Sequence, residues 1–416
     1  AKLIEREEFK TTALVRRVLN ANFRLGAKEN AEALATFATR EDADETHRWE
    51  ALTLLSRWTD PPGRDFFTGE SWPLAKRDGA ELPTLVRRME LHGIAKAPRK
   101  IAVAWIELAA KCNASASAAT LVERAQDHDA DLEVRTAAIT AAAKIAPAAL
   151  EPALAALVSD REAKVRASAL GAIDALSPEK AYPLLEKAAN EGSREERRVA
   201  YVALAKLDDA RVDELLAYQL DKLRGGFTPV EVALDLVLAA EQRSATVVTL
   251  ALDALRAPRK LDPLLAPFVD SLYGGDKERG RRIFREKAET TCMRCHRIEW
   301  GEGGKVGPDQ RGVGARLSRL ELLEAIVDPN RRITSGFESV MFTIDDARYV
   351  AGVVVEEDAE TIVVRNAQDE LVDLDARSIT ARKPDLSAMP QDVSKTLSRE
   401  ELRDLLEYLA NLGDDQ

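Results

Sequence analysis

The sequence is poor in the residue types that most often bind metals and cofactors. Its 416 residues include three cysteines, four histidines and four methionines, and aromatic residues make up 5% of the chain. It has no run of about 18 apolar residues, so we expect no membrane span in this chain. The net charge of −11 argues against a nucleic-acid partner, because phosphate contacts require a basic surface. Any site built on cysteine or histidine therefore has few candidates.

Two of the three cysteines stand together in the segment Cys292-Met293-Arg294-Cys295-His296. The C-x-x-C-H pattern is typical of c-type haem attachment, because two thiols at this spacing can each bond one vinyl group. The imidazole that follows can then bind the iron. C-x-x-C also occurs in zinc sites and in thiol redox sites, and it can be a surface turn without a ligand.

Composition favours haem over these alternatives. A structural zinc site needs four nitrogen or sulfur ligands, usually in two spaced pairs. The remaining candidates are unpaired and far upstream: Cys112, His47, His92 and His128. A thioredoxin-type redox site needs a βαβ context, which this region lacks. We interpret Cys112 as a small core residue.

The residues around the motif predict helices and a close-packed loop. Asp276 to Glu286 has the pattern of a short amphipathic helix. Gly301 to Gly314 is rich in glycine, which permits a close approach to a flat macrocycle, and contains Pro308. A capping box begins each of two further predicted helices, Ser318 to Ile326 and Leu397 to Leu412, and the second helix carries a leucine stripe.

Residues from about 274 to 416 resemble a class I cytochrome c. They resemble more closely the haem-binding domain at the C-terminus of large bacterial multidomain proteins, in which a sugar-dehydrogenase-like β-propeller precedes HEAT-like repeats. The matching elements are Gly280, Phe284, Cys292 to His296, Val306 to Asp309, Leu322 to Ile326, Asp328 to Asn330, Ser387 to Pro390 and Tyr408-Leu409. The resemblance implies one haem c bound through Cys292 and Cys295. It also implies that Pro308 accepts a hydrogen bond from His296.

The second axial ligand of the iron is identified by elimination and by the resemblance. Met293 lies between the two cysteines, Met89 lies in the upstream helical region, and Met341 lies in an expected strand. Met389 stands in a proline-flanked loop, where the resemblance places the distal ligand. Ligation by His296 and Met389 leaves no open iron site and favours electron transfer. The alternative is a peroxidase-like haem enzyme or a sensor, in which Met389 does not bind.

The upstream region is repetitive. Apolar residues at equivalent helix positions recur at steps of 33, 31, 34 and 33 residues. These residues are Ile101, Val134, Val165, Val199 and Val232. A period in the low thirties, built from paired helices, is typical of an α-solenoid. The Val-Arg-x-x-Ala helix starts resemble HEAT repeats, although the usual HEAT period of about 40 residues is longer.

Between the haem motif and Met389 the apolar pattern changes from a helical period to alternation. This change predicts a small antiparallel insertion at about 337–380 with four strands. The expected strands are Ser339 to Ile344, Tyr349 to Glu356, Thr361 to Arg365 and Leu371 to Leu374. The resembling family carries the same insertion.

We therefore expect a mainly α protein, with a HEAT-like α-solenoid over residues 1–268 and a class I cytochrome c domain over 269–416. The expected function is electron transfer, without a catalytic residue, from a dehydrogenase partner or a missing domain to a respiratory acceptor. A further alternative is a structural interaction protein whose motif binds no haem. Haem attachment takes place outside the cytoplasm in bacteria, so we expect a periplasmic or other extracytoplasmic location and a removed signal or a longer parent chain.

Overall fold

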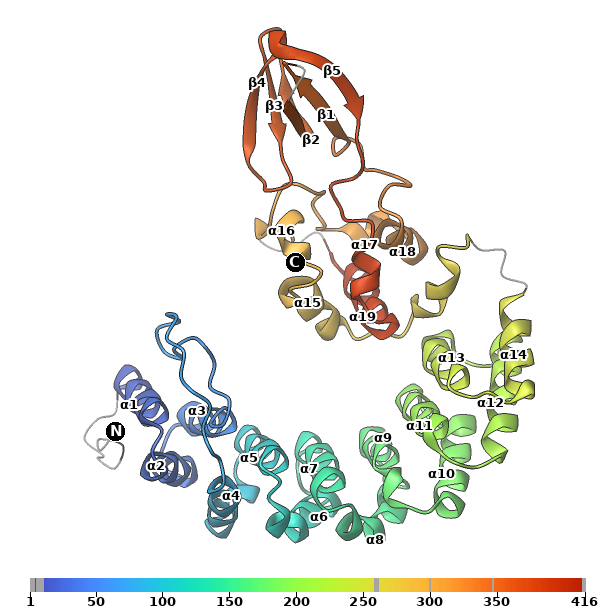
Figure 1. Ribbon diagram of the computed structural model, residues 1–416. Coiled ribbons are helices and arrows are strands. Elements are labelled where there is room, and N and C mark those ends of the chain that lie inside the picture. Colours follow the sequence, from blue (N-terminus) through green and yellow to red (C-terminus); the bar gives the residue numbers. More distant parts are fainter. Residues whose placement is uncertain (1–3, 5–10, 258–261, 299–300, 346–347, 414–416) are drawn as a thin grey trace. The chain divides into compact units, whose positions relative to one another are not determined.

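The computed structural model describes residue 4 and residues 11–257, 262–298, 301–345 and 348–413 (Figure 1). The chain forms two compact units, Ala1–Asp209 and Ala210–Gln416. This division lies upstream of the boundary at residue 268 that the sequence pattern indicates. The last helices of the expected solenoid, which follow residue 209, therefore belong to the second unit. The domain boundary at 268 stays a prediction.

The first unit contains paired helices that follow one another along the chain (Figure 1). These helices are α1 Thr12–Leu25, α2 Lys28–Thr39, α3 Glu45–Ser56, α4 Leu82–Leu91, α5 Arg99–Lys111, α6 Ala118–Gln126, α7 Leu132–Ile145, α8 Pro147–Leu157, α9 Ala163–Gly171, α10 Pro178–Glu191 and α11 Arg194–Lys206. Short 3₁₀ helices lie in both units, at Ile94–Lys96, Ser115–Ser117, Ile173–Ala175, Val230–Val232, Ala266–Ser271, Ala376–Ser378 and Val393–Thr396.

Arginines at equivalent positions tie successive helical pairs together. In α7, Arg135 Nε donates to the Ala125 carbonyl at 3.1 Å, and its guanidinium pairs with Asp160 in the loop before α9. In α9, Arg166 Nη1 donates to the Asp160 carbonyl at 2.8 Å, and Nε pairs with Glu196 of α11 at 2.8 Å. Each arginine therefore satisfies a loop or helix-end carbonyl and links its helix to the next pair.

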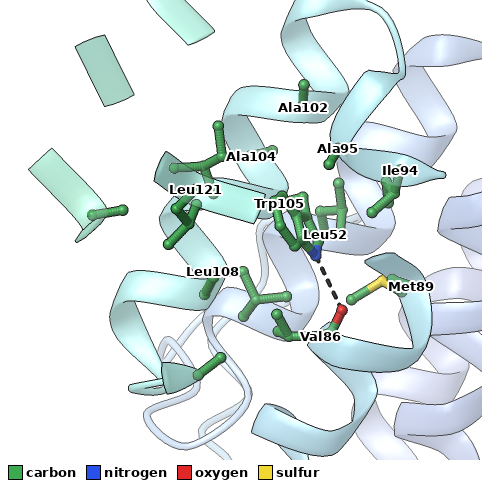
Figure 2. Packing of buried hydrophobic residues seen from close by; sticks show 14 of the residues in the cluster. Leu52, Val86, Met89, Ile94, Ala95, Ala102, Ala104, Trp105, Leu108 and Leu121 are labelled. Atoms are coloured by element: carbon green, nitrogen blue, oxygen red, sulfur yellow. Dashed lines mark hydrogen bonds between the residues drawn. The ribbon is translucent and has the colours of Figure 1, made fainter. Parts of the chain in front are cut away.

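Figure 2 shows how α5 packs into the core of the first unit. Trp105 is fully buried, and its indole nitrogen donates to the Val86 carbonyl at 3.2 Å. Met89 is buried in the same cluster, and Ala95 and Ala102 allow close approach of the neighbouring backbones. Met89 is thus a core residue of the first unit.

The segment between α3 and α4 is fastened to α1 by a buried carboxylate. Asp65 accepts hydrogen bonds from Asn20 Nδ2 and Arg24 Nη1, both at 2.9 Å. It also accepts the backbone N–H groups of Phe67 and Thr68, both at 2.9 Å. Burial raises the pKa of Asp65, but these hydrogen bonds outweigh burial and hold that pKa well below its usual range.

The second unit combines eight described helices with one sheet. The helices are α12 Arg211–Arg224, α13 Ala233–Glu241, α14 Thr246–Arg256, α15 Lys277–Glu286, α16 Cys292–Cys295, α17 Val313–Arg316, α18 Arg319–Val327 and α19 Arg399–Ala410. Helices α18 and α19 begin with the expected capping boxes, Ser318 with Glu321 and Ser398 with Glu401. Local sequence therefore determines where both helices start.

Helices α15 and α19 cross at close range. A Cβ atom at Gly280 would lie 2.0 Å from the Asp404 carbonyl oxygen, so only glycine fits this crossing. The rings of Phe284 and Tyr408 pack with their centroids 5.8 Å apart. The two helices and α18 surround one apolar cluster, which includes Phe284, Leu323 and Leu406.

A buried ion pair joins α13 to α19. Arg403 Nη1 lies 2.7 Å from Asp235 Oδ2, and the two side chains are 2% and 8% exposed. On the same face of the helix, Arg399 Nη1 pairs with Glu241 of α13 at 2.8 Å. Within the second unit, two ion pairs therefore hold α13 against α19.

The sheet is antiparallel, with the strand order β4-β3-β2-β1-β5. Its strands are β1 Ser339–Ile344, β2 Arg348–Glu357, β3 Thr361–Arg365, β4 Leu371–Asp375 and β5 Ile379–Pro384. The four expected strands are present as β1 to β4, and β5 adds a fifth at the end of the insertion, which was expected near residue 380. This edge strand pairs only with β1, and most of its residues are exposed, so it lacks apolar alternation.

In the part of the chain that the structure describes, none of the helices combines the length and apolar character that a membrane crossing requires.

Candidate functional site

The C-x-x-C-H motif forms a single helical turn, α16, with its imidazole at the end. Thr291 precedes the turn in the left-handed conformation, with φ +47°. Cys292 and Cys295 are half-buried free thiols, and their i, i+3 spacing places them on one side of the turn. His296 follows in an extended conformation, so its ring leaves the turn next to the two thiols.

The imidazole of His296 is held in one tautomer. Its Nδ1 atom lies 2.9 Å from the Pro308 carbonyl oxygen, the contact expected from the sequence. A carbonyl oxygen can only accept, so Nδ1 carries the proton and Nε2 keeps its lone pair. Burial lowers the pKa of His296 and outweighs the opposing effect of the Pro308 hydrogen bond. The ring is therefore neutral at neutral pH, as metal ligation requires.

Gln310 also takes part in this hydrogen bond, and the sequence did not identify it. Its Nε2 atom lies 3.0 Å from the Pro308 carbonyl and 3.0 Å from His296 Nδ1. Because Nδ1 is a donor, the amide of Gln310 donates to the second lone pair of the carbonyl. The only signal in the sequence is its position two residues after Pro308, which does not distinguish Gln310 from other polar loop residues.

The glycine-rich loop packs directly on the motif. A Cβ atom at Gly303 would lie 2.1 Å from the His296 carbonyl oxygen, and one at Gly304 would lie 1.9 Å from that of Arg294. A Cβ atom at Gly307 would lie 2.6 Å from Cε1 of the imidazole. The loop therefore requires glycine because it covers the backbone of the motif and one side of the ring.

The two thiols do not have the character of a reactive pair. Burial raises the pKa of Cys292 and of Cys295, whereas reactive thiols have a lowered pKa. Among the residues that the structure describes, no three His, Cys, Asp or Glu side chains are arranged to hold a metal ion. The donor set here is one imidazole and two neutral thiols, which does not fit structural zinc.

Met389 packs against the same apolar cluster as Cys292 and Met293. Its loop is tied down by two hydrogen bonds, from Met389 N to Ser387 Oγ at 3.2 Å and from Ser387 N to Asn330 Oδ1 at 2.8 Å. The structure thus brings a half-buried thioether to the cluster that the motif adjoins. The role of Asn330 was missed, although the segment that contains it was part of the resemblance.

The residues present fit a haem. Cys292 and Cys295 offer two thiols, His296 offers Nε2, and Met389 offers a sulfur. Cys292 and Met389 pack against one apolar cluster, and the His296 ring lies 6.5 Å from that of Phe284 in this cluster. In addition, Asn330 Nδ2 is a buried donor without an acceptor among the described residues, as expected next to an additional acceptor group.

The remaining cysteine and histidines belong to the first unit. Cys112 is partly buried against its core, and burial raises the pKa of this thiol to about 11. His47 is buried in α3, and His92 ends α4. His128 contacts Asp160, which already pairs with Arg135. These histidines are structural or surface residues in the described fold. Met341 is half-buried in β1.

Comparisons with known proteins give a match to HEAT repeats and a partial match to cytochrome c. The family model for HEAT repeats matches residues 118–205, so the chain contains HEAT repeats there. Cytochrome c of Arabidopsis thaliana is 30% identical to this chain over 64 residues, which are 15% of this chain and 54% of that protein. The match therefore spans about half the length of this relative. The chain is mostly helical, with HEAT repeats and a small antiparallel sheet.

Proposed function

We propose that the C-terminal part of this chain is a class I c-type cytochrome domain that transfers electrons. The observation that carries this proposal is the hydrogen bond from His296 Nδ1 to Pro308, which leaves Nε2 free to bind iron beside two neutral thiols. The partial similarity to cytochrome c supports the same function.

Each residue has a role that follows from its surroundings. Cys292 and Cys295 would hold the macrocycle through thioether bonds, and His296 Nε2 and Met389 Sδ would be the axial ligands. Bound haem would supply a one-electron carrier. The Pro308 carbonyl, with Gln310, fixes the orientation and basicity of the imidazole, and the apolar cluster keeps water away from this side of the site.

If His296 and Met389 both bound the iron, no coordination position would be left for a substrate, and the protein would relay electrons rather than transform a substrate. The proposed donor is a dehydrogenase, either a separate partner or a domain of a longer chain, and the proposed acceptor is respiratory. Because haem is attached to thiols outside the cytoplasm in bacteria, we also propose an extracytoplasmic location. The HEAT repeats would present this electron-transfer domain to its partners, since helical repeats offer extended binding surfaces.

The first test is covalent attachment. We expect the pyridine haemochrome spectrum of the purified protein to show about one haem per chain that acidified butanone does not extract. Cys292→Ala with Cys295→Ala should abolish this covalent haem. Cys112→Ala, which changes the only other cysteine, should leave it intact. Protein made with a haem-attachment system that still lacks covalent haem would overturn the proposal.

The second test concerns the axial sulfur. The oxidised protein should show the weak far-red absorbance of methionine bound to ferric haem. Met389→Ala should abolish this band, whereas Met341→Ala, at a half-buried methionine in β1, should retain it. A high-spin spectrum that Met389→Ala does not change would instead indicate an open iron and a haem enzyme or sensor.

A further inference from the structure

One end of the β-sheet carries three chain segments that meet the rest of the unit. The chain enters β1 at Ser339 and leaves β5 at Pro384, and Val340 pairs with Pro384. Ser339 also pairs with Val353 of β2, which in turn pairs with Arg365 at the end of β3. The β3–β4 turn therefore lies at the same end as both chain connections.

The β3–β4 turn is rigid. Asn366 Oδ1 accepts the N–H groups of Gln368 and Glu370 at 2.9 and 3.0 Å. Its backbone N–H donates to the Glu370 carbonyl at 3.0 Å, and Asp369 has φ +66°. Asparagine and aspartate tolerate this conformation better than most residues, so the turn holds the Asp369 carboxylate in a fixed place.

That carboxylate reaches the glycine-rich loop of the candidate haem site. Asp369 Oδ2 accepts the backbone N–H of Lys305 at 3.1 Å, and Oδ1 accepts Arg365 Nη1 at 2.6 Å. Lys305 lies between Gly304, which packs on the motif backbone, and Gly307, which packs on the imidazole of His296. The contact is thus made in the middle of the loop that covers the motif.

The Asp369 carboxylate is charged where it meets this loop. Burial raises the pKa of Asp369, but the hydrogen bonds from Arg365 and Lys305 outweigh burial and keep the group ionised at neutral pH. A negative charge, paired with Arg365, therefore lies against the loop that packs on the motif and on His296.

We propose that Asp369 is a positioning residue for the haem site, by which the β-sheet fixes the loop over His296 and lowers the reduction potential. The electrostatic part rests on the proposed function, because it requires haem at the motif. A negative charge stabilises ferric haem relative to ferrous haem, since oxidation adds one positive charge. The loop part depends only on the contact from Asp369 to Lys305.

The loop is tested by hydrogen exchange of the full chain, with or without haem. Asp369→Gly removes the carboxylate without backbone strain, because glycine accepts φ +66°. We expect the amide of Lys305 to exchange about tenfold faster, as for a lost charge-assisted hydrogen bond. Asp345→Gly is the matched control, because Asp345 is an exposed aspartate with φ +48° in the turn after β1. Equal exchange of Lys305 in both variants would overturn the positioning role.

The charge is tested by optical redox titration of Asp369→Asn, which keeps the size and turn preference of the side chain. We expect its midpoint potential to shift upward, whereas Asp345→Asn should match the wild type. An unchanged potential in Asp369→Asn would overturn the electrostatic part. If the chain carries no covalent haem, the proposed function fails, and the exchange of Lys305 still decides whether Asp369 positions the loop.

Discussion

The buried pair between Arg403 and Asp235 gives a prediction whose size follows from the structure. Arg403→Met removes the guanidinium but keeps a long apolar side chain, and it leaves the Asp235 carboxylate buried without this counter-ion. Breaking a buried ion pair by removing one partner costs about 3–5 kcal/mol. Arg403 Nε is already buried without an acceptor among the described residues, so its removal returns about 1 kcal/mol. We therefore expect a net loss of about 2–4 kcal/mol.

Native-state hydrogen exchange of the slow amides in α13 and α19 measures this loss, because it reports the free energy of local opening. Arg399→Met is the matched control on the same helix. Arg399 is 20% exposed. It pairs with Glu241, which is 32% exposed, and its second contact, with the buried Asp270, is 3.7 Å long. Its loss should therefore cost about 1 kcal/mol, less than the loss of Arg403.

Two results would refute this reasoning. One is an effect of Arg403→Met no larger than that of Arg399→Met. The other comes from a double variant. If the buried carboxylate that has lost this counter-ion causes the loss, adding Asp235→Ala to Arg403→Met should recover at least about 1 kcal/mol. No recovery would mean that the arginine stabilises the helix pair by packing alone.

Three further predictions follow from close contacts. Gly307→Ala places a Cβ atom 2.6 Å from the His296 ring and should perturb the low-spin haem spectrum, whereas Gly413→Ala, in open space, should not. Gly280→Ala, with its Cβ 2.0 Å from a backbone oxygen of α19, should lower the opening free energy of α19 by about 2–3 kcal/mol in hydrogen exchange. Asp65 has a lowered pKa when folded, so it stabilises the first unit above about pH 4, and this contribution is lost as the pH falls. In denaturant unfolding followed by tryptophan fluorescence, the wild type should therefore be more stable than Asp65→Asn at pH 7, and this difference should shrink as the pH falls below about 4.

The sequence predicted those features that depend on local chemistry. Ser318 and Ser398 begin α18 and α19 because their hydroxyls and the glutamates three residues later satisfy the free N–H groups of the first turn. The Val-Arg-x-x-Ala starts identified helices of the repeats because their apolar residues recur at fixed spacing. The helix at Asp276 to Glu286 was identified for the same reason, and its structure begins after Asp276 as the N-cap.

The features that were missed depend on contacts between distant segments. Strand β5 is an exposed edge strand, so no apolar alternation marks it. Gln310 and Asp369 are ordinary polar loop residues in the sequence, and only the folded chain brings them to His296 and Lys305. The Arg403–Asp235 pair joins residues that are 168 positions apart, and charge patterns along one helix do not predict such a contact.

The same long-range contacts bear on how the C-x-x-C-H turn should be interpreted. A surface turn without a ligand would not require its own backbone to be covered. Gly303 and Gly304 nevertheless pack so closely on it that a Cβ atom at either position would lie 2.1 or 1.9 Å from a carbonyl oxygen of the motif. Nor would such a turn require a half-buried, neutral imidazole whose Nδ1–H is engaged by Pro308. A cofactor bound to these atoms would account for their arrangement, and covalent haem is the cofactor that two neutral thiols and one imidazole at this spacing can hold.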